Sequence, residues 1–285
     1  MVRFRTMGTG GLRGGLAALT ALAALACAPA ASAADYEVPW TVDAALLAQG
    51  EAPNSAPPGA NDFDCKPSKA HPEPVVLVHG LLANQTVNWR TISPFLANRG
   101  FCVFSLTYGT KDDVTTPLYQ PGGLRTLQSS AKELKAYVKQ VLRRTGAEKV
   151  DIVGHSEGSL MPDWYVRFLG GAKVVDDYVG MTTLWEGTNT LGLATLNQMA
   201  VGFGLDPALV PTIDRFCSSC RQFLQGSKFF QRLHARGVNA RRVTYTNIVT
   251  KNDELVMPYT SGLMAPAPNV TNVCLLYTSP SPRDS

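Results

Sequence analysis

The stretch from Lys149 to Leu160, which reads KVDIVGHSEGSL, limits the possible folds of this chain more than any other. Its first residues form a short apolar run rich in β-branched side chains, which is typical of a buried strand. The motif GHSEG follows at residues 154–158, and the apolar pattern beyond it fits a helix. Ser156 is therefore predicted to sit on a sharp strand-to-helix turn, where a Cβ at either flanking glycine would collide with the neighbouring strand or helix.

This arrangement is that of a nucleophile elbow, because the helix after Ser156 would aim its free N–H groups and positive dipole end at the reacting centre. The motif alone is weak, since the chain has 25 glycines in 285 residues and G-x-S-x-G arises by accident in such chains. A Gly-rich turn with an idle serine is the alternative, and other stretches must decide between the two.

Residues 1–33 are predicted to be a secretory signal peptide. Three arginines precede an apolar run at residues 15–26 that is too short to span a bilayer, and residues 31–33 (ASA) form a small-x-small cleavage site. Cys27 lies in a poor context for acylation, so we expect a secreted chain without a stable membrane anchor. Loss of the three arginines lowers the formal net charge from +4 to +1, which leaves no basic footprint for a nucleic acid.

The rest of the chain predicts one α/β domain over residues 74–273, preceded by an irregular N-terminal arm at 34–73. Continuous apolar strands alternate with helical patterns, so we expect a parallel sheet covered on both faces. The expected strands are 74–80, 101–108, 150–153, 177–181 and 242–249, and the expected helices are 89–98, 124–144 (ended by Gly146) and the one after Ser156. An insert at 188–241 is either a set of covering helices or a cap that receives an acyl chain.

The cysteines predict disulfides, because these persist in an exported protein. Cys65 precedes the first core strand and Cys102 lies in the next, so a Cys65–Cys102 bond would staple the edge of the sheet. Cys217 and Cys220 could close a tight local loop. A redox motif or a metal site is the weaker interpretation of this second pair, since it lacks a preceding strand, a nearby histidine and a further cysteine pair.

Two further stretches support Ser156 as a nucleophile. Residues 79–81 (HGL) follow a buried strand, a place that can supply the Leu81 N–H to an oxyanion hole together with the Glu157 N–H. Residues 250–258 (TKNDELVMP) follow a late strand and offer Asp253, with Glu254 as the second choice, for the acid of a triad. A solvated turn is the alternative for this acidic loop.

Residues 75–80, 84–89, 154–158 and 253–258 together resemble the class 2 lipases, secreted bacterial triacylglycerol lipases and esterases of the α/β-hydrolase superfamily. The resemblance implies an α/β-hydrolase fold and ester hydrolysis through an acyl-enzyme, with no cofactor, and we expect no metal site. It implies Ser156 as nucleophile, Asp253 as acid and Leu81 with Glu157 as the oxyanion pair, whereas His79 would order its loop. Many relatives have Met or Gln at the position of Glu157, but only its N–H is needed, and a carboxylate at a helix start is favourable.

The histidine that this family uses as base is absent from the expected place. The four histidines are His71, His79, His155 and His234, and none follows Asp253. Residues 274–285 look like a non-native read-through tail that interrupts a strand, with a genuine Ser/Pro-rich tail as the alternative. We therefore expect a C-terminally truncated chain that hydrolyses esters poorly.

Two other functions use the same residues differently. A cutinase-like polyesterase would share the fold and the nucleophile, and a non-catalytic α/β-hydrolase-like binding protein would share the fold alone. The partner expected from the motifs is an ester or lipid substrate, and we expect a monomer.

Overall fold

A parallel six-stranded sheet organises the computed structural model, which describes residues 35–189, 214–235 and 237–275. The strand order is β2-β1-β3-β4-β5-β6, and every neighbouring pair is parallel. The strands are β1 (Val75–Val78), β2 (Val103–Leu106), β3 (Val150–His155), β4 (Val175–Met181), β5 (Thr244–Thr250) and β6 (Val270–Leu275). The predicted parallel sheet is confirmed, and each predicted strand is present with ends shifted by a few residues.

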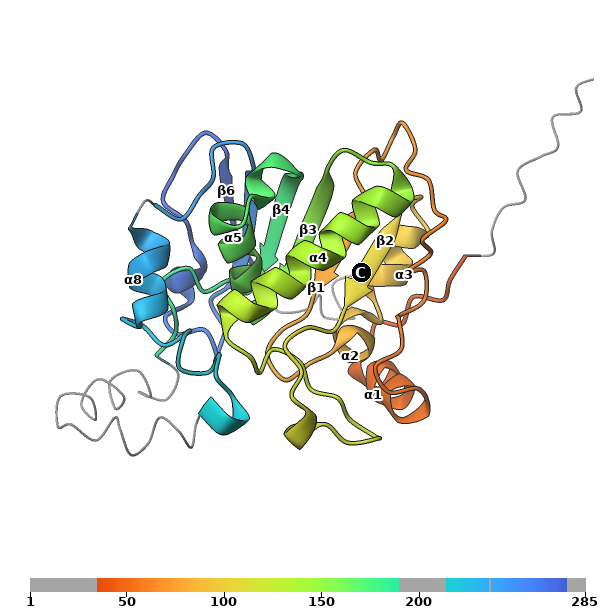
Figure 1. Ribbon diagram of the computed structural model, residues 1–285, viewed down its shortest axis with the longest axis horizontal. Coiled ribbons are helices and arrows are strands. Elements are labelled where there is room, and N and C mark those ends of the chain that lie inside the picture. Colours follow the sequence, from red (N-terminus) through yellow and green to blue (C-terminus); the bar gives the residue numbers. More distant parts are fainter. Residues whose placement is uncertain (1–34, 190–213, 236, 276–285) are drawn as a thin grey trace, which may run out of the picture. The chain divides into compact units, whose positions relative to one another are not determined.

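Helices cover both faces of this sheet, and in Figure 1 the long helix α4 crosses the strands on one of them. The described helices are α1 (Val42–Glu51), α2 (Gln85–Trp89), α3 (Ile92–Ala97), α4 (Leu127–Thr145), α5 (Glu157–Phe168) and α8 (Lys228–His234). Short 3-10 turns lie at Asp112–Val114, Gly171–Lys173 and Tyr259–Gly262. None of the helices in the described part of the chain is long and apolar enough to cross a lipid bilayer.

The two faces follow from the alternation of side chains along a strand. In β1, Val76 and Val78 point into the larger core, which contains the buried sides of α4 and α5. Val75 and Leu77 point the other way, into a smaller cluster with Trp89 at the end of α2. All four side chains of β1 are at most 3% exposed, so this strand is buried on both faces, as its continuous apolar sequence predicts.

The burial pattern and both ends of helix α4 follow from its sequence. Its apolar stripe is buried on the sheet, and its lysines face away from the core. Thr126 caps the start by accepting a hydrogen bond from the N–H of Ser129, and Gly146 ends the helix in the left-handed conformation at φ 79°. The predicted helix and its glycine cap are confirmed.

One prediction about the N-terminal arm is wrong. Residues 42–51 of the expected irregular arm form α1, whose Ala- and Leu-rich sequence favours a helix although Leu46 and Leu47 face outwards. The arm is held instead by polar contacts, in which Gln49 bonds the carbonyl of Leu118 and the side chain of Asn84. The helix expected over 89–98 is present as α3, with its start shifted to Ile92, and the short helix α2 precedes it, capped by Asn84, which accepts from the N–H of Val87.

The Cys65–Cys102 disulfide forms as expected and joins the arm to the outer strand of the sheet. The two Cα atoms are 5.8 Å apart, and Cys102 directly precedes β2, the strand at one end of the sheet order. Strand β6 at the other end pairs with β5 as far as Thr250 and Leu275. The sheet therefore includes Cys274 and Leu275, two residues of the expected tail, while 276–285 lie outside the described residues.

Other predictions cannot be followed in the structure. The predicted signal peptide and the first, apolar part of the predicted insert, from Leu191 to Leu205, lie outside the described residues. The later part of the insert contains α8, whose Phe229, Phe230 and Leu233 are buried in the larger core. For α8, the interpretation as an ordinary covering helix is therefore the correct one.

Candidate active site

Ser156 lies at the carboxyl edge of the sheet, between the last residue of β3 and the first of α5. Its backbone adopts φ 53° and ψ −122°, a conformation that non-glycine residues avoid because it costs about 1–3 kcal/mol. The N–H of Ser156 donates to the carbonyl of Met181 at the end of β4, over 2.9 Å, which ties the turn to the neighbouring strand. The turn predicted from the motif therefore has the strained geometry of a nucleophile elbow.

The glycines on either side of Ser156 leave no room for a side chain. A Cβ on Gly154 would lie 2.1 Å from the carbonyl oxygen of Gly158, and a Cβ on Gly158 would lie 2.1 Å from that of Val78 in β1. Both obstacles are backbone atoms, so no rotamer change can relieve them. The predicted collision with helix and strand is confirmed at both positions.

The loop after β1 lies directly against the elbow. A Cβ on Gly80 would lie 3.2 Å from the Cβ of Ser156, so the two backbones are in close contact. The fully buried His79 ring orders this loop, because its Nδ1 bonds the carbonyl of Gly80 over 2.8 Å. That carbonyl and the N–H of Leu81 belong to one peptide unit, so fixing the oxygen on one side points the N–H to the other.

The protonation of His79 follows from its partners. Its Nε2 receives the N–H of Tyr108 over 3.3 Å and must carry the lone pair, so Nδ1 carries the hydrogen that bonds Gly80. Burial lowers the pKa of His79 to about 4, so the ring stays neutral at physiological pH. His79 thus has the loop-ordering position that the resemblance implied.

The N–H groups of Leu81 and Glu157 form no hydrogen bond within the part of the chain that the structure describes. Leu81 follows the Gly80 loop, and Glu157 opens α5 next to Ser156. Two free donors beside one serine could bind a developing oxyanion, as the sequence predicted for these residues.

The side chain of Glu157, whose carboxylate was expected to be favourable at a helix start, is buried. It is 1% exposed, and burial raises its pKa well above the usual value, which favours the neutral carboxyl group. Its Oε2 lies 3.4 Å from the hydroxyl of Ser219, and a Cβ on Gly123 would lie 3.0 Å from the same oxygen. The motif predicted a backbone role for Glu157 but carried no signal for this burial.

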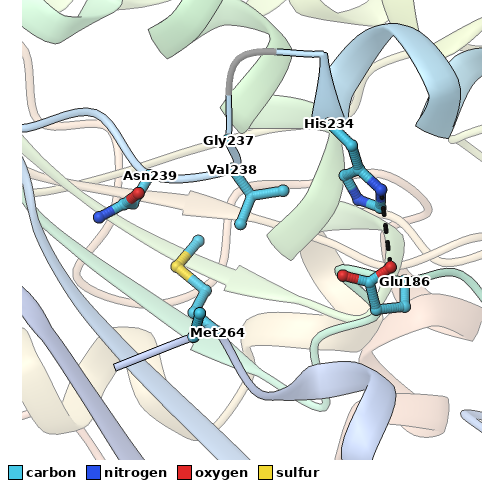
Figure 2. Close-up of a pocket in the computed structure, with 7 residues that line it drawn as sticks. Glu186, His234, Gly237, Val238, Asn239 and Met264 are labelled. Carbon is cyan, nitrogen blue, oxygen red and sulfur yellow. Dashed lines mark ion pairs between the residues drawn. The ribbon is translucent and has the colours of Figure 1, made fainter. Parts of the chain in front are cut away.

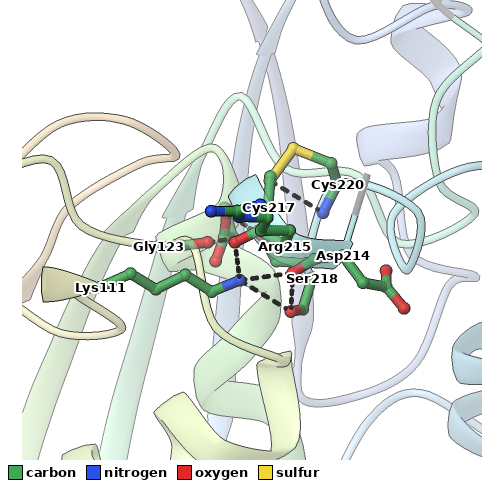
Figure 3. Close-up of a disulfide and its surroundings, with 9 residues drawn as sticks. Lys111, Gly123, Asp214, Arg215, Cys217, Ser218 and Cys220 are labelled. Carbon is green, nitrogen blue, oxygen red and sulfur yellow. Dashed lines mark hydrogen bonds between the residues drawn. A yellow bond between two sulfur atoms is a disulfide. The ribbon is translucent and has the colours of Figure 1, made fainter. Parts of the chain in front are cut away.

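Ser219 belongs to the second predicted disulfide loop, which Cys217 and Cys220 close with Cα atoms 5.4 Å apart. Figure 3 shows Lys111 reaching across to this loop, with Nζ bonded to the carbonyls of Asp214 and Arg215 and to the hydroxyl of Ser218. Ser219 itself donates to the carbonyl of Gly123. The disulfide is therefore a structural bond that packs the loop onto the Glu157 carboxyl.

A second buried acid, Asp163, lies further along α5 and accepts the hydroxyl of Tyr245 over 3.0 Å. Burial raises its pKa to about 7, although Arg167 and Tyr245 partly oppose the shift. As pH rises, the carboxyl group loses its proton in the unfolded chain before it does so in the folded protein. The free energy of unfolding therefore keeps the whole contribution of Asp163 below about pH 4 and loses it progressively between about pH 4 and 7.

We therefore expect Asp163→Asn to abolish this pH dependence, because asparagine does not titrate and keeps the oxygen that faces Tyr245. The difference in unfolding free energy between variant and wild type should grow in favour of the variant by about 1.4 kcal/mol per pH unit between pH 4 and 7. Urea unfolding at several pH values measures this slope. A difference that stays constant with pH would show that Asp163 is ionised in the folded protein.

Asp253 lies on the loop after β5, at the same edge of the sheet as Ser156. Its Oδ1 accepts the N–H groups of Leu255 and Val256 over 2.9 and 2.8 Å, which holds the half-buried carboxylate in one orientation. Its charge acts on His155, where it raises the pKa, although burial lowers that pKa by more. Glu254 is exposed, so the structure favours Asp253 over the second choice.

The four histidines have other partners. His155 Nδ1 bonds Asn88 Oδ1, His71 stacks on Phe101 with centroids 3.7 Å apart, and His234 bonds the carbonyl of Trp185. In the described residues, no hydrogen bond joins a histidine to Ser156 or Asp253. No group of three or more His, Cys, Asp or Glu side chains in the described ranges could hold a metal ion.

A pocket of about 280 Å³ lies elsewhere, beside α8 (Figure 2). Glu186 and His234 lie together on one side of it, with His234 Nδ1 3.5 Å from Glu186 Oε2, and Val238 and Met264 are its apolar lining. Ser156 and Asp253 do not line this pocket. The sequence carried no pattern that predicted it.

Comparison with known proteins identifies relatives of this chain. The family described as lipase (class 2) matches residues 72–274. Two curated relatives, from Pseudarthrobacter phenanthrenivorans and Burkholderia plantarii, are each named triacylglycerol lipase. Each is 39% identical over 94 residues, which cover 30% of this chain and 26% or 23% of the relative. The chain thus spans about a quarter of the length of these relatives.

Two solved structures resemble the fold. Aspergillus fumigatus lipase B has a TM-score of 0.54 at 17% identity, over 84% of this chain and 51% of its own. The mature form of Bacillus licheniformis lipase BlEst2 has a TM-score of 0.51 at 14% identity, over 78% and 87% respectively. At such identities the likeness concerns the fold, and it confirms the predicted α/β-hydrolase fold.

The family match extends from before β1, through the elbow and the loop after β5, to β6, which is well over half of the chain. This protein therefore belongs to the class 2 lipase family.

Proposed function

We propose that this protein is a secreted hydrolase of carboxylic esters, chiefly lipid esters, with Ser156 as its nucleophile. The observation that carries the proposal is the elbow itself. Ser156 is held at φ 53°, Gly80 packs against it, and the N–H groups of Leu81 and Glu157 lack partners among the described residues. A folded chain keeps this strain and these unpaired donors only where the surrounding structure enforces them, and such outliers cluster at active sites.

In the proposed reaction, a histidine oriented by Asp253 removes the proton from Ser156 Oγ, which attacks the ester carbonyl carbon. The carbonyl oxygen becomes the oxyanion and accepts hydrogen bonds from the N–H groups of Leu81 and Glu157. Loss of one such donor costs about 2.7–4 kcal/mol of transition-state stabilisation. The base returns its proton to the leaving alcohol, and water then releases the acid from the acyl-enzyme by the same steps.

The proposed base is a histidine that follows β6 in the full-length protein, since no histidine of this sequence follows Asp253. In this fold the triad follows the chain order Ser, Asp, His, and β6 is the next strand after the one that carries Asp253. The carboxyl ends of parallel strands share one edge of the sheet, so a residue leaving β6 is within reach of Asp253.

Lipid esters are the proposed substrates because exposed apolar side chains lie on the two loops that carry the other proposed site residues. Leu82, on the loop after β1, is 51% exposed, and Leu255 and Met257, on the loop after β5, are 73% and 45% exposed. Apolar surface beside a catalytic serine suits an acyl chain better than a charged metabolite. The family and the names of the two curated relatives agree with this substrate class.

A fluorophosphonate probe tests the proposal, because it labels only a serine that a base has activated. We expect the full-length protein, read from the gene past the codon for Val273, to be labelled at Ser156. Ser156→Ala should abolish the label, whereas Ser159→Ala, in the same turn, should keep it. A full-length protein that resists the probe would instead be an α/β-hydrolase-like binding protein.

A further inference from the structure

Asn88 in α2 connects the two segments that meet at the candidate active site. Its Oδ1 accepts the N–H of Gly80, after β1, over 3.0 Å. The same oxygen lies 3.0 Å from Nδ1 of His155, the last residue of β3. One side-chain oxygen therefore contacts the residue before Leu81 and the residue before Ser156.

These contacts determine which hydrogens are present. The N–H of Gly80 can only donate, so the Asn88 atom that faces it is the amide oxygen. An amide oxygen cannot donate, so Nδ1 of His155 must carry a hydrogen. Burial lowers the pKa of His155, which makes the neutral ring with hydrogen on Nδ1 the form at pH 7.

Gly80 has little freedom between its partners. His79 holds its carbonyl over 2.8 Å, and Asn88 holds its N–H over 3.0 Å. On the remaining side, a Cβ would be 3.2 Å from the carbonyl oxygen of His155 and from the Cβ of Ser156. With both of its polar groups fixed, the peptide that carries the Leu81 N–H has one orientation relative to Ser156.

We propose that Asn88 is a positioning residue. It fixes the loop after β1, which carries the Leu81 N–H, relative to the end of β3, which Ser156 follows. This inference rests on the proposed function, because it assigns the Leu81 N–H to the oxyanion. Without the Asn88 oxygen, the N–H of Gly80 and Nδ1 of His155 lose a shared acceptor and the loop can rotate away. Misplacement of a catalytic group by about 1 Å lowers turnover by about 100-fold.

Kinetics of the full-length protein test the inference with p-nitrophenyl butyrate as substrate. We expect Asn88→Leu to lower kcat by about 10- to 100-fold while KM changes by less than about threefold. Asn88→Asp keeps an oxygen in place and should recover about tenfold or more of that loss. Asn84→Ala is the matched control, because it removes the cap of the same helix, lowers the melting temperature and leaves kcat within about twofold.

A second measurement uses the 285-residue chain and needs no catalysis. The ¹⁵N shifts of the His155 ring should show hydrogen on Nδ1 in the wild type. The Gly80 amide should exchange at least about tenfold faster in Asn88→Leu than in the wild type, because it loses its acceptor. If Asn88→Leu does not fold, the wild-type ring shifts and the kcat of Asn88→Asp decide the question.

Specific results would overturn the inference. A His155 ring with hydrogen on Nε2 alone contradicts the shared acceptor. An unchanged kcat in folded Asn88→Leu, or a kcat in Asn88→Asp that is no higher than that of Asn88→Leu, contradicts the positioning role. The proposed function fails separately, if Ser156→Ala leaves turnover unchanged in the full-length protein.

Discussion

The 285-residue chain is expected to hydrolyse p-nitrophenyl butyrate on the order of 10⁶-fold more slowly than a class 2 lipase with a complete triad. None of its four histidines follows Asp253, and in the described residues none is hydrogen-bonded to Ser156 or Asp253. Triad members act as a unit, so a serine without its base is almost as inactive as no serine. The initial rate of p-nitrophenol release should therefore differ little between this chain and Ser156→Ala.

Added imidazole makes this prediction sharper, since a free base can take over part of the missing role. At about 0.1 M imidazole, the part of the rate that depends on Ser156 should rise at least about tenfold. It should still stay far below the rate of an enzyme with a complete triad, because a base held by the protein has an effective molarity of about 10⁵ M or more. Ser156→Ala in the same buffer measures the direct attack of imidazole on the ester. Rapid turnover without imidazole that Ser156→Ala abolishes would mean that a residue of this chain already acts as the base.

The sequence predicted best what depends on local pattern. The elbow at Ser156 and the helix ended by Gly146 follow from glycines and apolar spacing within a few residues of one another. The Cys65–Cys102 bond followed from the expected strand order. Each of these features needs few tertiary contacts to be deduced.

The features that the sequence did not predict depend on contacts between distant segments. Gln49 holds α1 through Leu118, 69 residues away, and Glu157 is buried by Ser219, 62 residues away. Asn88 looks like an ordinary polar helix residue until the fold brings it against His155, 67 positions later. A buried polar side chain has no periodicity, so only the assembled structure reveals its partner.

Replacing Gly158 by alanine is expected to destabilise the fold by more than about 4 kcal/mol, at the severe end of single substitutions. The new Cβ would lie 2.1 Å from the carbonyl oxygen of Val78 and 2.2 Å from that of His79. Both oxygens belong to the backbone where β1 passes into the loop that follows it, so relief requires α5 to move away from the sheet. Alanine gains about 1 kcal/mol of helix propensity over glycine, which is too little to offset this clash.

Gly50→Ala is the matched control for this prediction. Gly50 also lies within a helix, α1, but a Cβ there would meet nothing within 4 Å. We expect this variant to be as stable as the wild type or more stable by about 1 kcal/mol, because only helix propensity changes. Urea unfolding followed by circular dichroism compares the two variants under one condition. Equal stability of Gly158→Ala and wild type would mean that α5 can shift without cost, and the close contact between β1 and α5 would then not explain why the motif needs its second glycine.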